Sequence, residues 1–192
     1  MAFKTILVPI EQHDLMNSTL QTALTLARQF DRYIEGFALR ADIRAAFAVG
    51  DVGAVPIPPS TQEIAENEKR SRTLFEKFLQ EHGVPSGGDT KSLSCGWLKD
   101  APEGDQFLGS HGRVFDVIVL AKPGRDARGP RMSTLEAALF ESGRPILIAP
   151  PSPPPQMGTN VLIAWNCSTE QARATALNRP ASRELVLVKR GR

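Results

Sequence analysis

The sequence predicts an α/β protein in which helices cover both faces of a doubly wound, mainly parallel sheet. Segments typical of strands alternate along the chain with segments of helical periodicity. The strand segments are continuous apolar runs rather than alternating apolar and polar residues, as expected for strands buried on both faces. With 192 residues, 41% of them hydrophobic and 23% charged, the chain can form one complete core and a smaller second unit, or two small domains.

The first strand is predicted at 5–10, a continuous apolar run that tolerates Pro9 near its end. Apolar residues then recur at helical spacing over 20–27, so a helix is expected to begin near residue 17 or 18. Residues 33–39 are predicted to form the second strand.

The next segment, 41–59, is rich in Ala, Gly and Pro and is predicted to be a long loop with room for one short helical turn. Ser60 and Glu63 have the spacing of a capping box, which marks the start of a helix. Its apolar stripe covers 71–79, and Gly83 is expected to end it.

Three further strands complete the pattern, at 90–95, 117–121 and 145–149. Between the first two of these, 102–113 is predicted to be a weak helix, because each of its glycines costs about 1 kcal/mol relative to alanine. Between the last two, a helix is expected at 133–143, opened by a second capping box, Ser-Thr-Leu-Glu.

A proline-rich segment then separates this pattern from a shorter one. Five of the six residues 150–155 are proline, which predicts a stiff linker over 151–159. The segment 160–177 again reads as strand, short turn and a helix opened by Ser-Thr, like the start of the chain. We therefore expect a complete domain over 1–150 and an incomplete second repeat over 160–192, with chance similarity as the alternative.

This second unit can hold only a β-α-β stub, because Pro180 ends its helix and one strand-like run, 184–188, follows. The exposed edges of such a stub need a partner. The sequence leaves open whether the chain is cut, ends here naturally, or docks the stub on another surface.

Charge and composition argue against several classes of protein. The net charge is +2, but five of the 23 basic residues and only one of the 21 acidic residues lie from Arg179 onward, so the rest of the chain is slightly acidic and nucleic acid is not expected as a partner. No apolar run approaches the ~18–20 residues of a membrane helix. The first strand begins almost at once, so no signal peptide is expected. Cys95 and Cys167 suit a reducing, cytoplasmic location, and no cysteine or histidine has metal-ligand spacing.

The candidate site lies at the carboxyl ends of the strands. Helix N-termini meet there, and their free amides and positive dipole ends attract anions. In a doubly wound sheet the ligand crevice opens where the strand order reverses. The end of the first strand offers Pro9, Ile10 and Glu11, whose carboxylate can hold a ribose hydroxyl. The loop after 117–121 offers glycines, basic side chains and hydroxyls: Lys122, Gly124, Arg125, Arg128, Gly129, Arg131, Ser133 and Thr134.

Three segments carry a resemblance to a known family: Ile-Leu-Val-Pro-Ile-Glu at 6–11, Phe-Asp-Val-Ile-Val-Leu-Ala at 115–121 and Arg-Pro-Ile-Leu-Ile-Ala at 144–149. The chain resembles the universal stress proteins, in particular their tandem-repeat members. The resemblance implies a Rossmann-like, five-stranded parallel sheet of order 3-2-1-4-5, with two copies or two repeats paired across the fifth strand. It also implies that ATP-binding members carry an Asp after the first strand and G-x2-G-x9-G-[ST] after the fourth.

This sequence departs from that motif. Ala121 takes the place of the first glycine, and Gly124 matches the second. Met132-Ser133 takes the place of the closing Gly-Ser after a shorter spacing, and Glu11 takes the place of the aspartate. A methionine where backbone should meet phosphate predicts a degenerate nucleotide pocket. The candidate cofactor-binding residues are Pro9, Ile10, Glu11, Ala121, Lys122, Gly124, Arg125, Ser133 and Thr134.

Other candidate residues have simpler structural explanations. The Gly-Ser-His-Gly-Arg segment around His111 looks like a phosphate loop but precedes a strand, so we expect a loop or broken helix with its histidine on the surface. Cys95 is predicted to be a small buried residue rather than a reactive thiol. Glu103 and Asp105 are predicted to be solvated carboxylates in the first turn of a helix rather than an acid–base pair. His13 is expected to be a loop histidine, with ligand contact as the alternative, and the loop arginines form either a phosphate grip or a solvated face.

Two function hypotheses follow. The first is a non-catalytic stress-response module with a degenerate nucleotide pocket that acts through dimerisation. The alternative is a domain that binds ATP, and hydrolyses it slowly at most, using Gly124 and Ser133. No set of nucleophile, base and orienting residue points to another enzyme class, which would rest on fold analogy alone. The expected partner is a second copy, paired through the strand from Ile146 to Ala149, with the stub strand 161–165 contributing by exchange.

Overall fold

The computed structural model describes residues 3–40, 60–87, 90–124, 129–153, 155–165, 168–178 and 184–189, so the loop expected at 41–59 lies outside it. The strands are β1 (Thr5–Ile10), β2 (Tyr33–Ala38), β3 (Ser94–Leu98), β4 (Val117–Ala121), β5 (Ile146–Ala149), β6 (Asn160–Trp165) and β7 (Glu184–Lys189). The helices are α1 (Met16–Phe30), α3 (Thr61–Glu81), α4 (Asp105–Gly112), α5 (Met132–Glu141) and α6 (Thr169–Asn178). Among these residues, no helix is long and apolar enough to cross a membrane.

The first five strands form one sheet in the order β3-β2-β1-β4-β5, and every neighbouring pair is parallel. This confirms the predicted fold class and strand order. Because β1 lies at the centre, the chain moves outward to β2 and β3 on one side and then to β4 and β5 on the other. The order therefore reverses between β1 and β4, and a crevice is expected at the carboxyl ends of these two strands.

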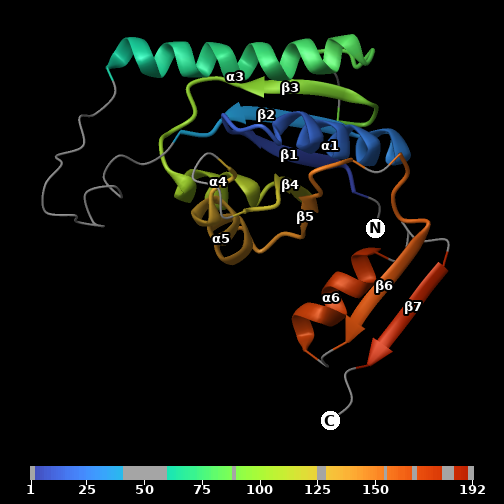
Figure 1. The fold of residues 1–192 in the computed structure, drawn as a ribbon. Coiled ribbons are helices and arrows are strands. Elements are labelled where there is room, and N and C mark those ends of the chain that lie inside the picture. Colours follow the sequence, from blue (N-terminus) through green and yellow to red (C-terminus); the bar gives the residue numbers. More distant parts are fainter. Residues whose placement is uncertain are drawn as a thin grey trace, which may run out of the picture.

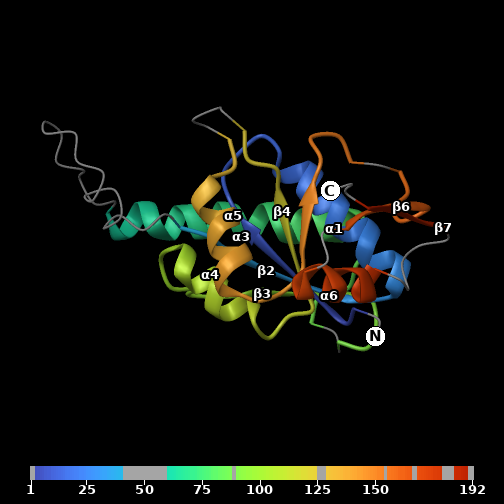
Figure 2. The ribbon, with the colours of Figure 1, turned by 90° about the horizontal axis from the view of Figure 1, so that it is seen from below.

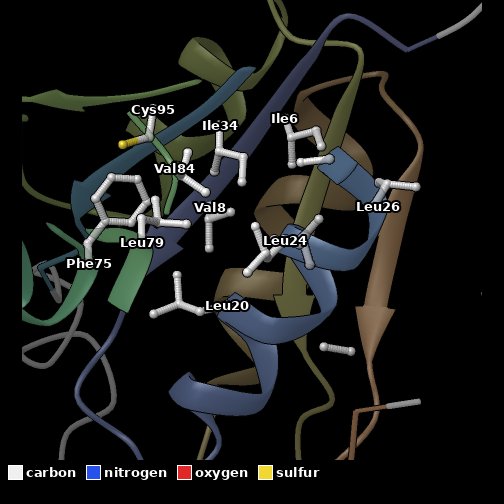
Figure 3. Packing of buried hydrophobic residues seen from close by; sticks show 14 of the residues in the cluster. Ile6, Val8, Leu20, Leu24, Leu26, Ile34, Phe75, Leu79, Val84 and Cys95 are labelled. Carbon is white, nitrogen blue, oxygen red and sulfur yellow. The ribbon is translucent and has the colours of Figure 1, made fainter. Parts of the chain in front are cut away.

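Helices cover both faces of the sheet (Figures 1 and 2). On one face, Leu20 and Leu24 of α1 and Phe75 and Leu79 of α3 pack against the strands, as Figure 3 shows. On the other face, α4 and α5 cover a second cluster that includes Leu108 and Ala138. The two clusters explain why the strands are apolar throughout, because both sides of each central strand are buried.

The helix signals are only partly confirmed. At the start of α3, the Ser60 hydroxyl accepts a hydrogen bond from the Glu63 amide (3.2 Å), and the Glu63 carboxylate accepts one from the Ser60 amide (2.7 Å). The second predicted capping box is wrong. Helix α5 begins one residue early, at Met132, so Ser133 lies inside the first turn and caps nothing among the described residues. The predicted helix over 102–113 is shorter, and α4 covers Asp105–Gly112.

The predicted third strand is displaced along the chain, since β3 begins at Ser94 rather than at residue 90. Its register with β2 pairs Tyr33 with Ser94. Just before the strand, the Leu93 amide donates to the Asp31 carboxylate at 2.9 Å, and Asp31 is in the left-handed conformation. The turn after α1 therefore fixes where β3 can begin, and no local signal in the sequence reports this contact.

The amino ends of β1 and β4 are joined by one carboxylate. Oδ2 of Asp116 accepts hydrogen bonds from the amides of Lys4 (2.8 Å) and Thr5 (3.1 Å). The Thr5 hydroxyl also donates to it, at 3.2 Å. Asp116 is far from Lys4 and Thr5 in the sequence. Its hydrogen bonds hold the central strands β1 and β4 together at the end opposite the crevice.

After the proline-rich segment, β6 and β7 form a separate parallel pair joined by α6 (Figure 1). The Ser168 hydroxyl accepts a hydrogen bond from the Gln171 amide (3.2 Å), which caps this helix as predicted. In the part of the chain described, neither strand pairs with the five-stranded sheet. The β-α-β stub is thus present as an element order, and no other described strand pairs with either edge of its two-stranded sheet.

Candidate functional site

The carboxyl ends of β1 and β4 bring together part of the predicted site. Pro9, Glu11, Ala121 and Thr134 line a single small cavity there. Ile10 does not join them, because its side chain is fully buried in the cluster on the opposite face, under α1 and α3. The strand period of two residues explains the difference, since neighbouring side chains point to opposite faces of the sheet.

The loop residues of the prediction do not line this cavity. Lys122, Gly124 and Ser133 are exposed at its margin, and Arg125 and Arg128 lie outside the described residues. The predicted cradle of glycine, serine and basic side chains is therefore not seen as a unit. Arg131, the last arginine of the loop, fills the crevice instead.

Arg131 binds two carboxylates from different elements. Its Nε donates to Oε1 of Glu11 at 3.0 Å, and its Nη2 donates to Oδ1 of Asp105 at 2.9 Å. The Thr134 hydroxyl lies 2.6 Å from the same Glu11 oxygen and 3.1 Å from the same Asp105 oxygen. Loop, strand end, helix α4 and helix α5 thus meet in one network, and charge-assisted hydrogen bonds of this kind are among the stronger ones in proteins.

His13 extends the network on the side of β1. Its Nε2 lies 3.6 Å from Oε2 of Glu11, and its Nδ1 accepts a hydrogen bond from the Leu15 amide at 3.1 Å. That bond assigns the proton of the neutral ring to Nε2, which faces the carboxylate. Burial lowers the pKa of His13, and the neighbouring Glu11 carboxylate opposes this effect without reversing it.

The cavity that remains measures about 10 Å³, room for about one water molecule. Glu11 and Arg131 line it, and Asp105 binds Arg131 from behind the cavity wall; the Glu11 side chain is 11% exposed and that of Asp105 18% exposed. The crevice of the sheet is therefore occupied by side chains of the protein itself. Among the described residues, no group of three or more His, Cys, Asp or Glu could hold a metal ion.

Asp105 is the functional residue that the sequence interpretation missed. It was expected to be a solvated carboxylate in a first helical turn, but it is mostly buried against Arg131. Glu103 is separate and faces Arg40, with 3.8 Å between the charged atoms. A usable signal exists in the sequence, because the first turn of a helix that follows a parallel strand lies at the crevice edge.

The expectation that His111 is a surface residue is also wrong. The segment around it forms the second half of α4, and its Nε2 lies 2.9 Å from Oε1 of Glu35 on β2. The other carboxylate oxygen of Glu35 accepts a hydrogen bond from the Tyr33 hydroxyl at 3.0 Å. The imidazole stacks on Phe107, with 5.1 Å between ring centroids. These contacts of His111 join α4 to the sheet, on the face that α4 and α5 cover.

Cys95 is predicted from the sequence to be a small buried residue rather than a reactive thiol. Its side chain is buried in the cluster under α1 and α3, with 2% of the residue exposed. Burial raises the pKa of the thiol, which disfavours the reactive thiolate. These observations agree with the interpretation of Cys95 as a small buried residue. Cys167 lies outside the described residues.

Comparisons with known proteins identify the class of fold. No family model and no curated protein matches the sequence. Solved structures do match, and two of them are universal stress proteins. One is UspA from Lactobacillus plantarum, with TM-score 0.54 and 15% identity, over 78% of this chain and 99% of that chain. The other comes from Archaeoglobus fulgidus DSM 4304, with TM-score 0.63 and 13% identity, over 94% of this chain and 63% of that chain.

The strand order and these matches together establish that the chain has the fold of the universal stress proteins. At such identities the likeness concerns the fold alone. The chain spans 63% of the length of the Archaeoglobus protein, which it matches over most of its own length. The function of this chain therefore depends on its own crevice and surfaces.

Proposed function

We propose that this chain is a non-catalytic module of the universal stress type, whose nucleotide crevice is filled by its own side chains and which acts by association with a second copy. Its fold class and its likeness to two universal stress proteins support the type. The observation that carries the proposal is the guanidinium of Arg131 between Glu11 and Asp105, which leaves about 10 Å³ of free space. A nucleotide needs a pocket tens of times larger, on the order of 300 Å³ or more.

The electrostatics of the crevice support the same conclusion. A phosphate-binding site presents backbone amides and basic side chains to its ligand. Among the described residues, the guanidinium in the crevice is already paired with two carboxylates, and one of these, Glu11, lines the space that a phosphate would enter. The arrangement of charges thus supports a degenerate nucleotide pocket, in addition to the missing glycines.

Titration calorimetry of the full chain with ATP and magnesium tests this proposal. We expect no saturable heat at millimolar nucleotide, because binding would have to displace Arg131 and desolvate two carboxylates. Tight binding would overturn the proposal in favour of the alternative, an ATP-binding domain that uses Gly124 and Ser133. Those two residues are exposed beside the crevice and would be the first contacts of such a ligand.

The proposed association uses the free edge of the sheet. Strand β5 pairs with β4 on one side, and its other edge is hydrogen-bonded to no strand in the described part of the chain. Ile148 on this strand is 45% exposed, and the neighbouring helix α5 exposes Leu139 and Phe140. An apolar edge strand beside an apolar helix surface is a typical template for pairing with another copy. We further propose that residues 1–150 form the complete domain, residues 151–159 the linker, and β6 an additional strand that a dimer exchanges.

A further inference from the structure

The network in the crevice joins three segments that are distant in sequence. Arg131 ends the loop after β4 and is the N-cap residue of α5, whereas Glu11 follows β1 and Asp105 opens α4. Both carboxylates direct one oxygen to the same guanidinium and to the same Thr134 hydroxyl. That hydroxyl has a single proton, so it cannot satisfy both oxygens, and the arginine supplies the remaining hydrogen bonds.

The charges of the three ionised side chains determine what this crevice can accept. With Arg131 in place, its one positive charge is shared by two largely buried carboxylates, so this guanidinium is not free to bind an incoming anion. Like charges placed together at a desolvated site repel strongly. If neutral amides replaced the carboxylates, the same guanidinium would keep hydrogen-bond acceptors but lose both ion pairs, at the carboxyl ends of β1 and β4, where helix N-termini favour anions.

We propose that Arg131 is an internal ligand of the crevice, and that Glu11 and Asp105 exclude phosphate-bearing ligands by binding its guanidinium. The proposal rests on the proposed function, because it explains how the crevice is kept closed to nucleotides. It assigns the exclusion to two acidic side chains rather than to the missing glycines of the loop. Glu11 and Asp105 are thus specificity-determining residues, and Thr134 positions them.

The test replaces both carboxylates by their neutral amides and uses inorganic pyrophosphate as the probe. We expect titration calorimetry at low ionic strength to show saturable binding to the Glu11→Gln, Asp105→Asn variant. Its affinity should exceed that of the wild-type chain by about tenfold or more. Adding Arg131→Gln should abolish the gain, because the released guanidinium is the group that binds the anion.

A control variant, Glu103→Gln with Glu136→Gln, changes the net charge equally without touching Arg131. If the paired variant keeps its circular dichroism spectrum yet binds no better than this control, the inference is overturned. It is also overturned if the gain survives Arg131→Gln. Should the paired variant not fold, the single change Glu11→Gln must show a smaller gain in the same direction, and its absence again overturns the inference. Tight binding of ATP or pyrophosphate to the wild-type chain instead overturns the proposed function itself.

Discussion

At the scale of single residues, His13 shows how the crevice couples to pH. Its ring is buried beside Glu11, and burial lowers its pKa from the ordinary value of 6.5. The unfolded chain therefore takes up a proton near pH 6.5, while the folded chain keeps the ring neutral to a lower pH. This difference in pKa contributes its full stability above the pKa of the unfolded chain. The contribution falls as the pH drops below that value, and it stops falling below the pKa of the folded chain.

The measurement compares the wild-type chain with His13→Gln by urea unfolding at about pH 7.5 and about pH 5.5, on either side of the ordinary histidine pKa. We expect the wild-type chain to lose more stability on acidification, by up to about 1.4 kcal/mol over the one pH unit below the ordinary pKa. The variant lacks the titrating ring and should lose less. An equal loss in both proteins would show that the pH dependence comes from other groups.

Single residues also show where local interpretation fails. Asp105 and His111 were expected to be solvated, and Arg131 to grip a phosphate or be solvated, but each is instead held by a partner far away in sequence. The partners of Arg131 lie 120 and 26 residues away along the chain. No periodicity or capping rule reports such contacts, because these rules use only neighbours within a few residues.

At the scale of elements, the glycines of α4 are explained by packing. A Cβ at Gly109 would lie 2.5 Å from Cβ of Glu141 and 3.2 Å from the carbonyl oxygen of Ala137, both on α5. A Cβ at Gly112 would lie 2.6 Å from Cδ1 of Ile118 on β4. These glycines weaken the isolated helix, but they allow it to approach α5 and the sheet closely.

Two effects compete when Gly109 is changed to alanine. Helix propensity favours alanine by about 1 kcal/mol. The clash with α5 costs about 1–3 kcal/mol, because neither Cβ of Glu141 nor the backbone of Ala137 can move aside easily. We therefore expect Gly109→Ala to lower the free energy of unfolding measured in urea. Ser110→Ala, at an exposed position of the same helix, serves as the control and should change it little; a stabilised Gly109→Ala would show that α4 and α5 are not closely packed.

At the scale of the whole molecule, the free edge of β5 is the feature that predicts assembly. Changing Ile148 to lysine places a charge on the edge strand, which should prevent pairing with a second copy. We expect light scattering coupled to size exclusion to report a dimer for the wild-type chain at micromolar concentration and a monomer for Ile148→Lys.

The matched control for that experiment is Thr73→Lys, which adds the same charge to an exposed position of α3, a helix that packs on β2 and β1 rather than on β5. It should leave the dimer intact. A wild-type chain that elutes as a clean monomer would contradict the proposed association, and a dimer that survives Ile148→Lys would place the contact at another surface.

The sequence by itself determined the elements and their order. The apolar runs at β1, β4 and β5 coincide with strands within a residue or two, and the helical stripes of α1 and α3 face the core. These features are encoded locally, by burial on both faces of a strand or on one face of a helix. Resemblance to the universal stress proteins supplied the strand order, which periodicity cannot give.

Only the tertiary structure decided what the crevice contains. The sequence placed Glu11, Ala121 and Thr134 at one edge of the sheet, and the structure joins them there. It could not show that Arg131 turns inward to two carboxylates instead of outward to solvent or to a phosphate. That outcome depends on the distance and burial of charges from separate elements, and Coulomb energies are fixed only when the fold has brought those charges together.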